Sequence, residues 1–64
     1  MIKTAIRFGD NKVMVFNEKG EQLSRYQGEY EKVKDKILKA TPDDAIFQHC
    51  NHGVNFEVVE REKW

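Results

Sequence analysis

The spacing of apolar residues changes along this chain, and that change constrains the fold more than any other feature. Near the start, apolar side chains such as Ile6 and Phe8 recur at every second position, which is the period of a half-buried strand. From Tyr30 the spacing becomes i, i+3, i+7, the period of an amphipathic helix. After residue 44 the period of two returns. This order predicts an α+β domain in which one helix covers one face of a small sheet.

The N-terminal half predicts three strands joined by turns. Residues 2–8 form the first strand, and Gly9-Asp10-Asn11 closes it with residue types that favour turns. Residues 12–16 are rich in β-branched and aromatic side chains and form the second strand of a hairpin. Asn17-Glu18-Lys19-Gly20 is the next turn, whose final glycine suits a left-handed conformation. A shorter third strand is expected over residues 21–26.

The helix is predicted to begin after Gly28 and to run for about three turns. Its apolar stripe consists of Tyr30, Val33, Ile37, Leu38 and Ala40. Thr41-Pro42 ends it, because proline disfavours helical angles in the residue before it and cannot donate a backbone hydrogen bond. Ser24-x-x-Gln27 matches a capping box, so a start one turn earlier is the alternative.

A second hairpin is predicted after the helix. Residues 45–49 and 54–58 form its strands, and Cys50-Asn51-His52-Gly53 forms the turn. The order along the chain is then βββαββ, and we expect a small antiparallel sheet. Residues 60–64 are charged apart from Trp64, and we expect them to leave the sheet edge as a tail.

Size and charge narrow the functional classes. A chain of 64 residues forms one domain, residues 1–64, and can hardly enclose a substrate pocket without emptying its core. We therefore expect no enzymatic activity and no cofactor. Eleven basic and eleven acidic side chains give a net charge of zero, which makes nucleic-acid binding an unfavoured class.

The sequence indicates neither a membrane span nor an oxidising compartment. Its longest apolar run, Val13 to Phe16, is far shorter than the roughly 20 residues that a membrane helix needs. Its single cysteine, Cys50, cannot form an intramolecular disulfide. A cytoplasmic location is the expectation.

One helix can cover only one face of the predicted sheet, which leaves the other face uncovered. We expect the helix to pack on Ile6, Phe8, Phe56 and Val58 together with alternate residues of the second strand. Either Val13 and Val15 or Met14 and Phe16 then point away from the helix. The stems of Lys3 and Arg7 with the C-terminal residues could cover that face, or a partner could.

The favoured function is a non-enzymatic binding or regulatory module that acts through protein contacts. Its partner is a second copy or a larger protein. The predicted contact residues lie on the uncovered face, with the C-terminal tryptophan as an anchor; they are Met14, Phe16, Arg7 and Trp64.

Two other binding classes stay open as alternatives. Lys32, Lys36 and Lys39 form a basic stripe that could bind nucleic acid weakly, although acidic residues interleave with them. His49, Cys50 and His52 are ligand-type residues within four positions and could bind a metal, but no second ligand pair accompanies them.

The run from Ile6 to Val13, followed by Gly20, resembles the opening hairpin of actin-like ATPases and their nuclease relatives. Arg7 stands where those families place a catalytic aspartate. The resemblance covers about 15 residues and implies a hairpin here, and no activity is carried over to this chain.

Overall fold

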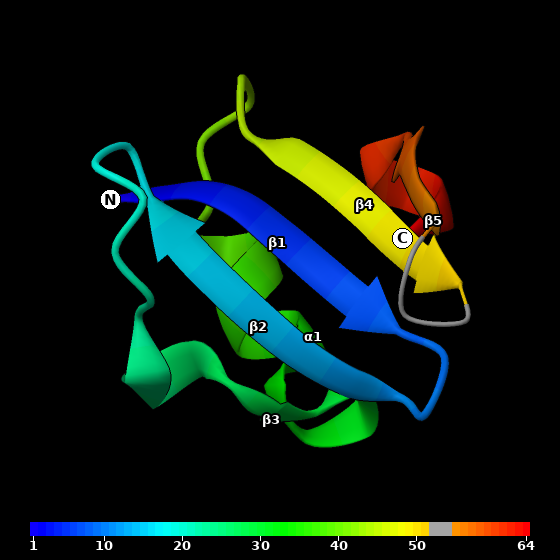
Figure 1. Cartoon of the computed structure of the whole chain (residues 1–64). Coiled ribbons are helices and arrows are strands. Elements are labelled where there is room, and N and C mark those ends of the chain that lie inside the picture. Colours follow the sequence, from blue (N-terminus) through cyan, green and yellow to red (C-terminus); the bar gives the residue numbers. More distant parts are fainter. Residues whose placement is uncertain (52–54) are drawn as a thin grey trace.

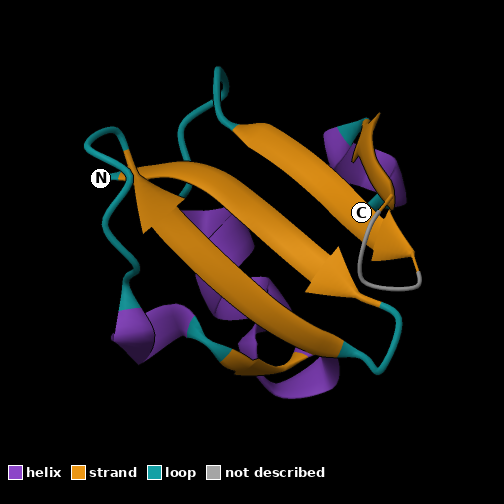
Figure 2. Ribbon diagram, viewed as in Figure 1, coloured by secondary structure: helices purple, strands orange, loops and turns teal. Residues whose placement is uncertain are grey.

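The computed structural model describes residues 1–51 and 55–64. One helix packs on one side of a five-stranded sheet, so the predicted α+β class is confirmed (Figure 1). Figure 2 shows the same view with helices and strands in different colours. The elements are β1 (Ile2–Phe8), β2 (Lys12–Asn17), the 3₁₀ turn η1 (Ser24–Tyr26), β3 (Gly28–Glu29), α1 (Tyr30–Ala40), β4 (Ile46–Asn51), β5 (Asn55–Val59) and the 3₁₀ turn η2 (Arg61–Lys63).

The sheet is mixed, which corrects the expectation of an antiparallel one. Its strand order is β3-β2-β1-β4-β5, and β1 pairs with β4 in parallel, while the other pairs are antiparallel. The parallel pair arises because α1 carries the chain across the sheet between β3 and β4, and a crossover of this kind returns the chain in the same direction.

The third strand is the other local correction. Residues 21–26, predicted as a strand, contribute only a single bridge between Phe16 and Gln22 before the η1 turn. The strand that pairs with β2 is the two-residue β3 instead. Only Leu23 and Tyr26 of this segment are apolar, too few to bury a strand face, and both pack against the core from the turn.

The helix begins and ends where the sequence predicts. It starts at Tyr30, after Gly28, whose φ of 141° lies outside the helical region. The backbone N–H of Tyr30 donates to the backbone carbonyl oxygen of Asn11 at 2.8 Å, which satisfies one of the free donors at the helix start. Tyr30, Val33 and Ile37 are buried as expected, whereas Ala40 is exposed.

The C-terminal residues pack onto the domain, so the expected tail is wrong. Trp64 is only 2% exposed and belongs to the core cluster. The guanidinium of Arg61 donates to the backbone oxygens of Leu38 and Thr41, and thereby supplies partners for free carbonyls at the end of α1. Arg61 caps the helix and the other charged residues of this segment face solvent, whereas the ring of Trp64 lies in the core.

Candidate functional site

The strand registers show which residues point away from the helix. Directly paired residues point to the same side of a sheet. Ala5 pairs with Val15 and Phe47, and all three belong to the core cluster with the helix residues Val33 and Ile37. Residues at the alternate positions therefore lie on the opposite side.

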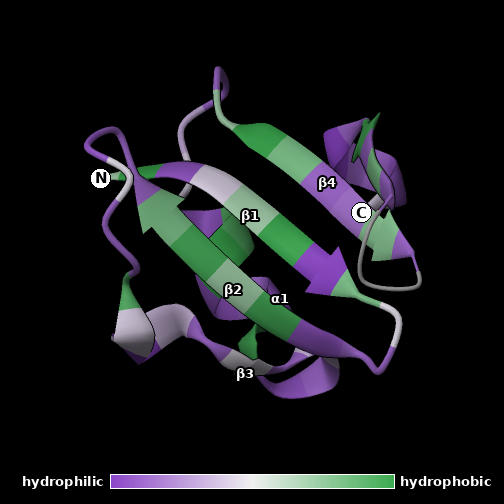
Figure 3. Ribbon diagram, viewed as in Figure 1, coloured by the Kyte–Doolittle hydropathy of each residue, from purple (hydrophilic) through white to green (hydrophobic). Residues whose placement is uncertain are grey.

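We call that opposite side the open face. Three rows of paired residues form it: Phe16, Thr4 and Ile46; Met14, Ile6, Gln48 and Val58; and Phe8, Cys50 and Phe56. Apolar residues run along the three long strands (Figure 3), and no described element lies over this side of them (Figure 1). These ten residues span four strands and are uncharged, and the next position of β2 on the same side, Lys12, pairs with Glu29 at the β3 edge.

Large apolar side chains on the open face are exposed to solvent. Val58 is 67% exposed, Phe56 55% and Ile46 39%. Cys50 and Ile6, in the two central strands, are buried by their neighbours. A contiguous apolar surface of this kind on a small domain is typical of a contact site.

Four residues expected beneath the helix lie on the open face instead, which is a correction. They are Ile6, Phe8, Phe56 and Val58. For Ile6 and Phe8 the cause is an irregularity of β1 between Ile2 and Thr4, which lets Ile2 and Ala5 both enter the core at a spacing of three. Phe56 and Val58 share their side because they pair through β4 with these two residues. Every later residue of β1 then points to the side opposite to the one that strict alternation from Ile2 predicts.

The structure separates the four predicted contact residues. Met14 and Phe16 lie on the open face, which is one of the two arrangements that the sequence leaves open for this strand. Arg7 and Trp64 lie on the helix side, where Trp64 packs against Phe47 with ring centroids 5.1 Å apart. The C-terminal residues therefore do not cover the open face. Ile46, Phe56 and Val58 also lie on the open face, which the sequence does not predict because only the strand register shows their side.

Arg7 is held on the helix side by Tyr30, Asn11 and Trp64. Its guanidinium carbon lies 3.6 Å from the centroid of the Tyr30 ring, in cation–π geometry. Its Nη2 and Nε donate to Asn11 Oδ1 at 2.8 and 3.1 Å, and its Nη1 donates to the backbone oxygen of Trp64 at 3.1 Å. These bonds fix the Arg7 side chain between the first hairpin turn, the start of α1 and the C-terminal residues.

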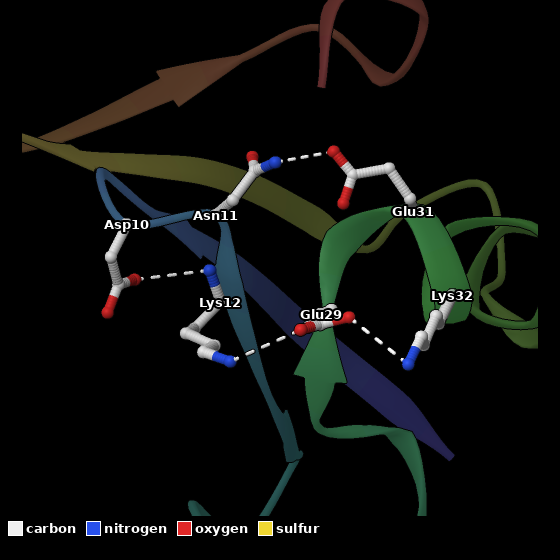
Figure 4. Close-up of polar contacts among 6 residues, drawn as sticks. All are labelled: Asp10, Asn11, Lys12, Glu29, Glu31 and Lys32. Atoms are coloured by element: carbon white, nitrogen blue, oxygen red, sulfur yellow. Dashed lines mark hydrogen bonds and ion pairs between the residues drawn. The ribbon is translucent and has the colours of Figure 1, made fainter.

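Asn11 should be the most sensitive residue of the first hairpin turn. It has a φ of 70°, and its side chain also donates to Glu31 at 2.5 Å (Figure 4). We expect Asn11→Gly to lower the free energy of unfolding by about 1 to 2 kcal/mol through the lost hydrogen bonds. Asn11→Ala should cost about 1 kcal/mol more, because alanine disfavours left-handed angles. Urea unfolding measures both; equal stability of the two variants would contradict the role of the backbone angle.

The three helix lysines do not form one free stripe. Lys32 Nζ lies 3.3 Å from Glu29 Oε2, and Lys12 approaches the other oxygen of that carboxylate at 3.8 Å (Figure 4). Lys32 and then Lys12 hold the pKa of Glu29 below its ordinary value. Lys36 and Lys39 lie nearer the end of the helix, beside η1. Lys32 thus shares a carboxylate with Lys12, whereas the ion pairs found in the described part of the chain do not include Lys36 or Lys39.

The predicted metal ligands divide between the two sides of the sheet. His49 lies on the helix side, where its Nε2 is 3.1 Å from the backbone oxygen of Trp64. Cys50, the next residue of the strand, points to the open face and is a buried free thiol. His52 lies outside the described residues. Within residues 1–51 and 55–64, no three His, Cys, Asp or Glu side chains gather as metal ligands would.

Comparison of the chain with protein-family models, with curated proteins and with solved structures finds no match. Among the described residues, no helix is long and apolar enough to cross a membrane.

Proposed function

We propose that this protein is a non-enzymatic binding module that pairs with a second copy of itself through the open face. The observation that carries the proposal is the exposure of Ile46, Phe56 and Val58 within a group of ten neighbouring, uncharged strand residues. Removing such side chains from water is favourable in proportion to their apolar area.

A second copy fits this surface better than a charged partner. In a twofold dimer each residue patch meets its own counterpart, so any charge on the patch would face a like charge. The ten residues of the open face avoid this conflict because they are uncharged, and Lys12 at its edge pairs with Glu29 of the same copy. The net charge of zero also removes long-range repulsion between two copies.

The size of the open face sets the expected affinity. Its ten positions, each about 4.8 Å by 6.8 Å, cover roughly 330 Å² of each copy. Two such faces bury about 650 Å² in total, which is below the range of tight, permanent interfaces. We therefore expect a reversible dimer with a Kd on the order of 10 to 100 μM. A cytoplasmic location belongs to the same proposal, since the one cysteine is a free thiol.

Sedimentation velocity over a dilution series tests the proposal. We expect twice the monomer mass of 7.6 kDa near 500 μM and the monomer mass near 1 μM, at both low and high salt. A chelator should change nothing. A mass that stays monomeric at every concentration would overturn self-association, and a dimer lost on chelation would assign the contact to a metal instead of the open face.

A further inference from the structure

A pocket on the helix side combines cations with an aromatic ring. It lies where the η1 turn meets the end of α1 and has a volume of about 320 Å³, close to the lower limit for small-molecule sites. Its lining residues are Arg25, Tyr26, Lys36, Lys39 and Ala40. Arg25 and Tyr26 belong to the η1 turn, and the other three residues lie near the end of α1. The apolar periodicity of the helix alone therefore does not indicate the pocket.

Three positive charges converge on this pocket. Lys36 Nζ donates to the backbone oxygen of Arg25 at 2.7 Å and lies 5.5 Å from the centroid of the Tyr26 ring. The Arg25 guanidinium carbon lies 5.2 Å from the same centroid. No carboxylate lines the pocket, and the ion pairs found in the described part of the chain use Lys12 and Lys32, not these three cations. The pocket therefore lacks a counter-charge.

The walls beneath the charges are apolar. The Tyr26 ring packs against the core, and Ala40 contributes a methyl group beside it. The stems of the two lysines add further apolar surface. A ligand that satisfies both parts of the pocket carries an anionic group for the cations and a flat ring for the tyrosine. Arginine and lysine donors suit phosphate oxygens in particular.

We propose that this pocket binds a nucleoside phosphate. Its phosphate accepts hydrogen bonds from Arg25, Lys36 and Lys39, and its base lies against Tyr26 and Ala40. The pocket is on the helix side of the sheet, so binding there is independent of pairing through the open face.

Titration of the ¹⁵N-labelled full chain with adenosine monophosphate tests this assignment. We expect saturable shifts of the backbone amides at residues 24–27 and 36–40. Inorganic phosphate and adenosine, which each satisfy one half of the pocket, should bind at least fivefold more weakly. Equal affinity of inorganic phosphate and the nucleotide would overturn the assignment of the base to Tyr26, and an absence of saturable shifts would overturn the site.

Two exposed lysines of the same helix give a matched comparison. Lys39→Gln removes a pocket cation and should weaken adenosine monophosphate binding at least fivefold. Lys32→Gln removes the same charge outside the pocket and should change the affinity less than twofold. Equal losses in the two variants would mean that net charge alone attracts the nucleotide. An oligothymidylate that binds far more tightly than the mononucleotide, with shifts extending to Lys32, would replace the proposed site by a nucleic-acid surface.

Discussion

Replacing Trp64 by alanine is expected to destabilise the domain by about 3 to 5 kcal/mol, the usual cost of removing a large aromatic side chain from a core. The ring is 2% exposed and contacts Phe47 and Tyr30, with centroids 5.1 and 5.5 Å away. Its indole N–H donates to the backbone oxygen of Gln48 at 3.1 Å. A domain of this size has a stability margin of only about 3 to 5 kcal/mol, so most of the variant should be unfolded at 37 °C.

Urea unfolding followed by circular dichroism measures this effect without depending on tryptophan fluorescence. Phe56→Ala is the matched control, because it removes an aromatic ring that is 55% exposed. At a protein concentration where the chain is monomeric, the control should lose less than about 1 kcal/mol. A Trp64→Ala variant that is as stable as this control would show that the C-terminal segment does not complete the core.

Replacing Val58 by lysine is expected to weaken self-association at least 100-fold and to leave the monomer folded. The side chain is 67% exposed in the single chain and lies in the central row of the open face, opposite Gln48. In a twofold dimer each copy would carry an unpaired ammonium into an apolar interface, at a cost of several kcal/mol.

Glu57→Lys is the control for charge on the same strand. Glu57 pairs with His49 and points to the helix side, so its replacement changes the net charge by more than the Val58 variant does without entering the open face. Sedimentation should find this control dimerising like the original chain. Equal loss of the dimer in both variants would indicate an effect of charge or of the β5 edge rather than of the open face.

The helix and both N-terminal turns are readable from the sequence because their signals are local. The stripe beginning at Tyr30 and the stop at Thr41-Pro42 determine α1, and Gly20 has the predicted left-handed angle, with a φ of 81°. These features depend on residues within one or two turns of each other.

The sequence does not show in the same way which strand residues point toward the helix. It depends on the irregularity after Ile2, which exchanges the two sides of β1. The inward position of Arg7 depends on Asn11, Tyr30 and Trp64, which come from three separate segments. No local pattern predicts that a charged residue will find such partners. The sequence also does not predict that β1 pairs with β4, because β2, β3 and α1 separate the two strands along the chain.

Intermolecular nuclear Overhauser effects in a mixed sample of labelled and unlabelled chains show directly whether two copies meet through the open face. The measurement is made at a concentration above the Kd found by sedimentation. The open-face interface predicts cross-peaks between copies from the methyl groups of Met14, Ile46 and Val58, and none from the core methyl groups of Val33 and Ile37. Intermolecular cross-peaks confined to helix-side residues, or none from the open face, would contradict it.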